Sequence, residues 1–265
     1  MAMQFGACVP AAAAGAAAAM GYEYVEIPAA DLCPESPDAD FARTAKTIEQ
    51  AGIPALAINY LVPPSMPFVG PSVDEERLRR YIASVSRRAA ALGGTTLVLG
   101  SGGARHVPDG FPRPTAEEQF RAFARMAGEE ADRNDLGVAI EPLNRTETNL
   151  LHTLEEAMAI ASTIDHPAVG VLIDAYHMHM AGEPFWHLLP ARSLLRHVQV
   201  CDQGRAYPGS RSLDLWALFI HLNHIGYAGS VSVECRWTSF SAEGAPALEF
   251  VRKASTTTGE LAFAP

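Results

Sequence analysis

The chain has 265 residues, of which 48% are hydrophobic, and its formal net charge is −10 at pH 7. This length fits one large domain or two small ones, and the apolar share is enough for a sizeable core. The acidic balance argues against a nucleic-acid partner, and no apolar run approaches the roughly 20 residues that cross a bilayer. The four cysteines show no C-x-x-C spacing, so we expect reduced thiols and a cytoplasmic location.

Eight short segments are strand candidates, and most of them are apolar and continuous, which is typical of strands that are buried on both faces. They cover residues 4–9, 22–27, 54–59, 95–100, 136–141, 169–174, 195–200 and 229–234. The alanine-rich stretch 11–20 predicts a first helix with Pro10 at its first turn. Apolar spacing near 3.6 predicts further helices over 41–51, 75–92, 115–134, 154–164 and 213–225. Left-handed helix caps are expected where glycines precede strands, at Gly21, Gly52, Gly93, Gly137 and Gly226.

Strict alternation of strands and helices leaves two architectures, a closed eight-stranded barrel or an open doubly wound sheet. Eight strands favour closure, and no G-x-G-x-x-G follows the first strand, which argues against a dinucleotide-binding fold. We therefore predict an α/β protein with a (β/α)₈ TIM barrel, formed as a single domain by residues 1–265.

Four oxygen-bearing side chains lie at the ends of the last four predicted strands: Glu141, Asp174, Gln199 and Glu234. In a (β/α)₈ barrel, the C-terminal ends of the strands converge on one mouth. A buried carboxylate cluster without a cation would repel itself, whereas oxygen ligands without a thiolate suit a hard divalent cation. We predict that these four residues bind Mn²⁺ or Mg²⁺, with Co²⁺ as an alternative.

Three further residues follow these strand ends and are predicted to bind the substrate. His177 follows the second ligand by three residues, and Glu147 and Arg205 follow the first and third by six. The loops after the strands form the pocket wall of a barrel. The alternatives are a solvated loop histidine, a surface ion pair between Asp202 and Arg205, and a Glu147–Arg145 pair.

Other polar residues carry weaker functional signals. We expect His197 to pack toward the helix layer rather than to bind metal. The loop Ser101-Gly-Gly-Ala-Arg105 could cradle a phosphate, but it lacks the Gly-Lys-Ser/Thr of a P-loop. Lys46 and Lys253 are the only lysines and lie in helical patterns, which argues against Schiff-base chemistry in the pocket.

The second half of the chain resembles one known family. The xylose-isomerase-like TIM barrels have segments similar to Glu141-Pro-Leu-Asn-Arg-Thr-Glu147, Asp174-Ala-Tyr-His177-Met, His197-Val-Gln199, Arg205…Pro208-Gly209 and Val233-Glu234. Within that superfamily, the chain resembles the sugar isomerases and epimerases, which include ketose 3-epimerases and hydroxypyruvate isomerases. This resemblance implies that the ligand set is Glu141, Asp174, Gln199 and Glu234.

The two branches differ at the third ligand. Ketose epimerases have a histidine there, usually in His-x-His, whereas hydroxypyruvate isomerases carry His-Val-Gln followed by an arginine, which His197-Val-Gln199 and Arg205 resemble. The segment Asn144-Arg145-Thr146-Glu147 resembles the epimerases instead. The resemblance therefore leaves the substrate open between the branches.

Both branches move a proton beside a carbonyl. Such a proton is acidic only if the enolate oxygen is stabilised, which a divalent cation on the substrate oxygens provides. Glu141 and Glu234 end the fifth and eighth predicted strands, and we predict that they act as the acid/base pair in addition to binding metal. Exchange at one carbon gives epimerisation, and transfer between adjacent carbons gives aldose–ketose isomerisation.

The predicted function is a metal-dependent isomerase or epimerase that acts through a metal-stabilised enediolate on a small polyhydroxy ketone or keto acid. The alternatives are a metal-dependent lyase or dehydratase of the same superfamily, a non-catalytic sugar-binding barrel, and a metal-dependent endonuclease. The net charge of −10 argues against the endonuclease. No nucleic-acid or membrane partner is expected, and assembly into a homo-oligomer is left open.

Overall fold

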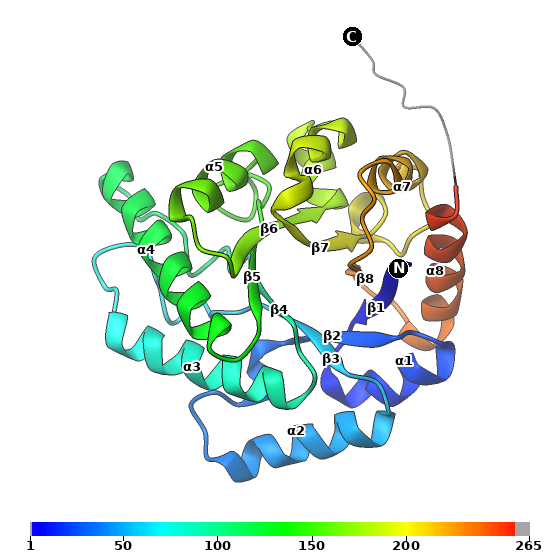
Figure 1. The fold of residues 1–265 in the computed structure, drawn as a ribbon, viewed down its shortest axis with the longest axis horizontal. Helices are drawn as coiled ribbons and strands as arrows, with labels where there is room; N and C mark the ends of the chain where they lie inside the picture. Colours follow the sequence, from blue (N-terminus) through cyan, green and yellow to red (C-terminus); the bar gives the residue numbers. More distant parts are fainter. Residues whose placement is uncertain (1, 258–265) are drawn as a thin grey trace.

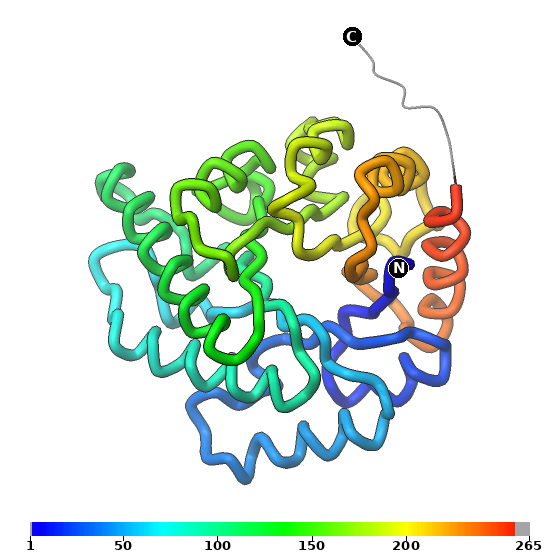
Figure 2. The backbone as a smooth tube through the Cα atoms, viewed as in Figure 1, coloured from blue at the N-terminus to red at the C-terminus, as the bar shows by residue number. Residues whose placement is uncertain are grey.

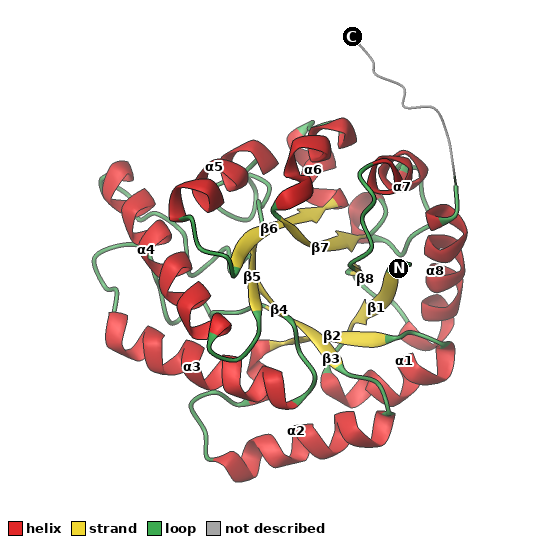
Figure 3. Cartoon of the chain, in the orientation of Figure 1, coloured by secondary structure: helices red, strands yellow, loops and turns green. Residues whose placement is uncertain are grey.

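Eight parallel strands close into a barrel that is ringed by helices (Figures 1 and 3). This computed structural model describes residues 2–257. The strands are β1 (Gln4–Cys8), β2 (Tyr24–Pro28), β3 (Ala55–Asn59), β4 (Thr96–Leu99), β5 (Gly137–Ile140), β6 (Val169–Asp174), β7 (Leu195–Val200) and β8 (Ser230–Val233). Neighbouring strands pair in chain order, and β1 pairs with β8 to close the ring. The predicted (β/α)₈ barrel is confirmed.

A helix follows each strand and carries the backbone back along the outside of the barrel (Figure 2). The helices are α1 (Ala14–Met20), α2 (Asp38–Ala51), α3 (Glu75–Ala91), α4 (Arg113–Asp132), α5 (Leu154–Ile164), α6 (Ala175–Ala181), α7 (Leu215–His224) and α8 (Phe240–Ser255). Short 3₁₀ helices cover Ala11–Ala13, Ala29–Leu32, Phe185–Ser193 and Gln203–Arg205. The last helix, α8, packs against α1 and α7 and completes the outer ring.

Side-chain oxygens cap several of these helices. Asp74 accepts a hydrogen bond from the backbone N–H of Arg77 at the start of α3, and Thr153 forms a capping box with Glu156 at the start of α5. Such caps satisfy backbone donors that the first turn leaves without partners. The helices therefore begin at defined points, which fixes the lengths of the loops at the barrel mouth.

The inner face of the barrel is unusually polar on one side. Bulky branched residues normally dominate this interior, but here a small apolar cluster of Val98, Ala139 and Leu172 lies on β4, β5 and β6. Buried polar side chains from β2, β7 and β8 fill the facing part: Tyr24, Glu26, His197, Gln199, Ser230 and Ser232. These polar residues lie two apart on each strand, as expected when alternate side chains share one face.

The element predictions differ from the structure in several missed helices and in one glycine cap. The helices α6 and α8 and the 3₁₀ helix over Phe185–Ser193 were not predicted. Gly137 is not a left-handed cap, because it is the first residue of β5, and Asp135 adopts the positive φ of 59° instead. The other four predicted glycine caps do have positive φ.

The single-domain prediction covered residues 1–265, but residue 1 and residues 258–265 lie outside the described part of the chain. Among the described residues, no helix combines the length and the apolar character that a bilayer crossing needs.

Candidate active site

The four predicted metal ligands lie at the same end of the barrel, on four neighbouring strands. Asp174 is the last residue of β6, Gln199 lies in β7, and Glu141 and Glu234 directly follow β5 and β8. Asp174 and Gln199 are paired in register across β6 and β7. Glu141, Asp174 and Gln199 are buried, and the side chain of Glu234 is 14% exposed. The strand ends therefore place four oxygen-bearing side chains at one mouth.

Three of these side chains hold a buried oxygen that has no hydrogen-bond partner within the described residues. These oxygens are Asp174 Oδ2, Gln199 Oε1 and Glu234 Oε2. A buried acceptor left without a partner costs about 1–3 kcal/mol, and more if it is charged. Three such acceptors on adjacent strands, two of them from carboxylates, have the donor chemistry of a hard divalent cation. The residues present therefore fit a metal ion.

Glu141 has room at this mouth because Gly100 has no side chain. A Cβ atom at Gly100 would lie 2.1 Å from Glu141 Oε2. Burial raises the pKa of Glu141 well above its usual range, and the charge of Asp174 raises it further. Burial and then the charges of Glu141 and Asp174 raise the pKa of Glu234 in the same way. The three carboxylates thus repel one another in a water-poor site, which a cation would relieve.

A second grouping at the mouth contains a histidine. Single ligand atoms of Glu141, Asp174 and His177 lie within 4.8 Å of one another. However, His177 Nδ1 accepts a hydrogen bond of 2.9 Å from the backbone N–H of Asn144, and His177 Nε2 lies 3.7 Å from Glu141 Oε1. The lone pair of His177 Nδ1 is therefore already used by Asn144. The oxygens of Asp174, Gln199 and Glu234 that have no hydrogen-bond partner among the described residues remain available, so they favour the predicted ligand set over one that contains His177.

His177 is not a solvated loop histidine, because it lies in α6 and is only 2% exposed. Asp174 Oδ1 caps this helix by accepting a hydrogen bond of 2.7 Å from the backbone N–H of His177. Burial lowers the pKa of His177 and favours its neutral form. Because Nδ1 accepts from Asn144, the proton of the neutral ring is on Nε2, which points toward the carboxylates of Glu141 and Glu147.

Arg205 reaches back over the mouth from the loop after β7. Its Nη2 lies 2.6 Å from Glu147 Oε1 and 3.1 Å from His177 Nε2, and its Nη1 lies 3.6 Å from Glu234 Oε2. The guanidinium also lies over the ring of Tyr176, 4.6 Å from its centre. Although burial opposes the charge of Arg205, Glu234 and Asp174 hold its pKa above the usual range. The three predicted substrate-binding residues are therefore in direct contact.

The two alternative ion pairs are wrong. Among the described residues, Glu147 pairs with Arg205 rather than with Arg145. Asp202 does not pair with Arg205, because its buried carboxylate accepts backbone N–H bonds from Gln203, Gly209, Arg211 and Leu213 at 2.8–3.2 Å. These bonds fold the loop that presents Arg205, whose own φ of 59° is left-handed.

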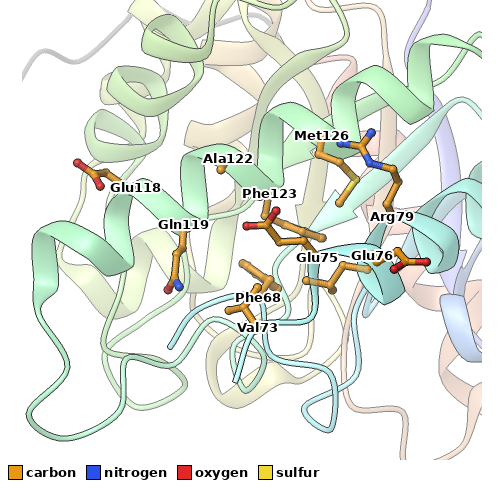
Figure 4. Close-up of a pocket in the computed structure, with 11 residues that line it drawn as sticks. Phe68, Val73, Glu75, Glu76, Arg79, Glu118, Gln119, Ala122, Phe123 and Met126 are labelled. Atoms are coloured by element: carbon orange, nitrogen blue, oxygen red, sulfur yellow. The ribbon is translucent and has the colours of Figure 1, made fainter. Parts of the chain in front are cut away.

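A cavity of about 190 Å³ lies beside Glu234 at the barrel mouth. Its walls include Cys8, Asn59 and Tyr60 from the ends of β1 and β3. A larger hollow of about 590 Å³ lies elsewhere, between α3 and α4, over Phe68, Phe123 and Met126 (Figure 4). That hollow contains none of the predicted ligands, whereas the smaller cavity borders Glu234.

Two buried residues beside the ligands, Glu26 and Arg105, were not predicted to contact them. Glu26 in β2 bonds to both Gln199 and His197 inside the barrel. Arg105 is fully buried and donates to the backbone carbonyls of Glu141 and Leu151, so its side chain is not free to bind the phosphate that its loop indicated only weakly. A charged residue within the otherwise apolar run of β2 was the available signal for Glu26.

The expected position of His197 is also wrong. His197 and Gln199 are two residues apart, so their side chains share the inner face of β7 instead of pointing in opposite directions. His197 Nε2 lies 2.8 Å from Glu26 Oε2, and His197 Nδ1 lies 2.6 Å from Ser230 Oγ. The histidine is therefore part of the polar barrel interior.

The chain matches the family described as xylose isomerase-like TIM barrel over residues 14–254. A ketose 3-epimerase of Arthrobacter globiformis is 38% identical over 111 residues, which cover 40% of this chain and 38% of that enzyme. A 3-dehydro-D-guloside 4-epimerase of Escherichia coli is 30% identical over 178 residues, which cover 64% of this chain and 68% of that enzyme. The crystal structure of a D-allulose 3-epimerase from Methylomonas sp. matches with a TM-score of 0.81 at 20% identity, over 96% of this chain and 100% of that one, which shows a shared fold.

Proposed function

The chain belongs to the xylose isomerase-like TIM-barrel family of sugar epimerases and isomerases, and we propose that it moves a proton next to the carbonyl of a small sugar in a metal-dependent reaction. Epimerisation at one carbon and aldose–ketose isomerisation are both compatible with this proposal. They differ in where the proton is returned, and the residues that move it are the same.

We assign Glu141, Asp174, Gln199 and Glu234 to hold a divalent cation, Mn²⁺ or Mg²⁺. The observation that carries this assignment is the set of three buried oxygens on β6, on β7 and just after β8 that have no hydrogen-bond partner among the described residues. When bound, the cation would stabilise the negative charge that develops on the substrate oxygen as the neighbouring carbon loses its proton.

Glu141 and Glu234 are proposed to transfer the proton. A carboxylate is a base that can remove a weakly acidic C–H proton when the negative charge left behind is stabilised. Glu141 Oε1 lies 3.7 Å from His177 Nε2, and Glu234 Oε2 lies 3.6 Å from Arg205 Nη1. Each carboxylate therefore borders one of two side chains that are themselves in contact, so that one carboxylate can take the proton and the other can return it.

The substrate is proposed to be a small polyhydroxy ketone or keto acid. His177 Nε2 and Arg205 Nη2 both carry protons and lie 3.1 Å apart, so neither can accept from the other. An oxygen of the substrate would accept from both, and Glu147 Oε1, which already accepts from Arg205, would orient the guanidinium. The cavity of about 190 Å³ beside Glu234 is consistent with a small ligand.

The test is a panel of ketoses and 2-keto acids, incubated with the protein and Mn²⁺, Mg²⁺ or Co²⁺ in D₂O. Proton exchange beside the carbonyl should incorporate deuterium into any substrate that fits, and EDTA should abolish the incorporation. Binding without incorporation across the panel would indicate a sugar-binding barrel. A product that has lost water, detected by mass spectrometry, would instead indicate a dehydratase.

Arg205→Ala is expected to lower kcat/KM by about 10- to 100-fold, because a hydrogen bond from a charged group contributes about 1.5–3 kcal/mol. Bound Mn²⁺ should stay at the wild-type level, since Arg205 is not among the proposed ligands. Arg211→Ala is the matched control, because Arg211 is an exposed arginine of the same loop. If Arg205→Ala and Arg211→Ala have the same kinetics as the wild type on the identified substrate, Arg205 does not bind it.

A further inference from the structure

Below the proposed ligands, the barrel interior contains a fully buried carboxylate whose two oxygens are both occupied. Glu26 Oε1 accepts a hydrogen bond of 2.6 Å from Gln199 Nε2, and Glu26 Oε2 lies 2.8 Å from His197 Nε2. Glu26, His197 and Gln199 are each 0% exposed. A buried carboxylate is strongly destabilising unless it is paired and hydrogen-bonded, so this arrangement needs an explanation.

The contact fixes which end of the Gln199 side chain faces Glu26. An ionised carboxylate can only accept hydrogen bonds, so the amide group of Gln199 must face it with the NH₂ end. The amide oxygen, Gln199 Oε1, is then left as one of the buried acceptors without a partner in the described residues. If the side chain were turned over, two oxygens would lie against each other at Glu26, and the NH₂ group would face the proposed cation site.

Further contacts hold Glu26 in place. His197 Nδ1 lies 2.6 Å from Ser230 Oγ, and Ser232 Oγ lies 3.2 Å from His197 Nε2 and 2.9 Å from the hydroxyl of Tyr24. These residues come from β2, β7 and β8, so the carboxylate is fixed relative to three strands. Its position does not depend on a mobile loop.

We propose that Glu26 is a positioning residue that holds the Gln199 amide with its oxygen turned toward the cation, and that His197 holds Glu26 in turn. This proposal rests on the proposed function, because it takes Gln199 as a ligand. A hydrogen bond from the NH₂ end to a carboxylate also increases the electron density on the amide oxygen, which strengthens a neutral ligand. Removing it would let the amide turn over, because its two ends have nearly the same shape.

The test measures the affinity of the purified protein for Mn²⁺ alone, by titration calorimetry or by the electron paramagnetic resonance signal of free Mn²⁺. In Glu26→Gln, one side-chain oxygen is replaced by a donor, so Gln199 or His197 loses its acceptor. We expect Mn²⁺ affinity to fall by about tenfold or more, within the 10- to 100-fold range for groups that orient metal ligands. Glu130→Gln, which removes a buried carboxylate on α4, is the matched control and should keep wild-type affinity.

A double-mutant cycle separates positioning from a general structural effect. Gln199→Ala should itself weaken Mn²⁺ binding, and adding Glu26→Gln to Gln199→Ala should cause no further loss, because Glu26 acts through Gln199. If Glu26→Gln does not fold, Glu26→Asp takes its place in the same double-mutant cycle. Aspartate keeps the negative charge but is shorter by one methylene group, so its carboxylate lies further from Gln199.

Three outcomes would overturn the proposal. If Glu26→Gln lowers Mn²⁺ affinity by the same factor in the wild type and in Gln199→Ala, Glu26 does not act through the Gln199 side chain. Wild-type affinity in Glu26→Gln, together with weakened binding in Gln199→Ala, would remove the role of Glu26 and leave the proposed metal site intact. Wild-type affinity in Gln199→Ala would show instead that the ligand set of the proposed function is wrong, and the role of Glu26 would fail with it.

Discussion

Replacing Glu234 by glutamine is expected to lower kcat by about 10²-fold or more on the best substrate of the panel, while the fold is kept. Glutamine has nearly the shape of glutamate but cannot take up the proton that the reaction removes. Glu234 Oε2 is buried and lies 3.6 Å from Arg205 Nη1, so the substitution removes a charged base at the proposed substrate site. The measurement is kcat at saturating Mn²⁺, with circular dichroism to check the fold.

Glu141→Gln should give a loss of similar size, because the proposed mechanism needs a second group to return the proton. Glu130→Gln again serves as the control for loss of a buried carboxylate away from the barrel mouth, and it should keep wild-type kcat. If Glu234→Gln or Glu141→Gln binds Mn²⁺ and turns over near the wild-type rate, that residue is not part of the acid/base pair.

The fold could be predicted because the barrel strands follow a simple rule. Strands β6 and β7 begin and end at the predicted residues: β6 is an apolar run that ends at Asp174, and β7 ends at Val200, directly after Gln199. Helix α6 was missed because it starts directly after β6, with Asp174 as its cap, so no loop residues separate the two elements. Helix α8 contains Gly244 and Pro246, which weaken the helical pattern of the sequence.

The candidate ligands could be located because each occupies a strand end, and the position of a strand end is a local property of the sequence. The partners of Glu26 could not be predicted, because Gln199 lies 173 residues further along the chain and His197 lies 171 residues further. A sequence pattern indicates which side chains face the barrel interior, but it does not indicate which of them meet across it. The close packing of Gly100 against Glu141 could not be predicted from the sequence for the same reason.

His177 shows which part of a prediction from a local motif the structure can decide. Its spacing from Asp174 predicted a position near the substrate, and the structure does bring it into contact with Arg205. The alternative of a solvated loop histidine is wrong, because His177 lies in α6, which Asp174 caps, and is buried. Whether His177, Arg205 and Glu147 bind the substrate stays a prediction.

Asp174 is expected to be essential for metal binding, and two substitutions separate this role from its role as a helix cap. Asp174→Ala removes both carboxylate oxygens, so Mn²⁺ content should fall to near zero. The loss of the Oδ1 cap on α6 should also lower the free energy of unfolding by about 0.5–2 kcal/mol. Asp174→Asn keeps an oxygen for the cap but removes the negative charge. It should therefore lose most of its Mn²⁺ while its thermal midpoint without metal stays close to that of the wild type.

The matched control is Asp214→Asn, because Asp214 caps α7 through a bond to the backbone N–H of Ala217 and lies outside the proposed ligand set. Metal content by elemental analysis and thermal midpoints with and without EDTA give the two readouts. If Asp174→Asn keeps stoichiometric Mn²⁺, then Asp174 Oδ2 is not a ligand, and its lack of a partner must be explained by some other group. If only Asp174→Ala loses metal, and it does so together with its fold, the cap accounts for the loss and the cation assignment at β6 fails.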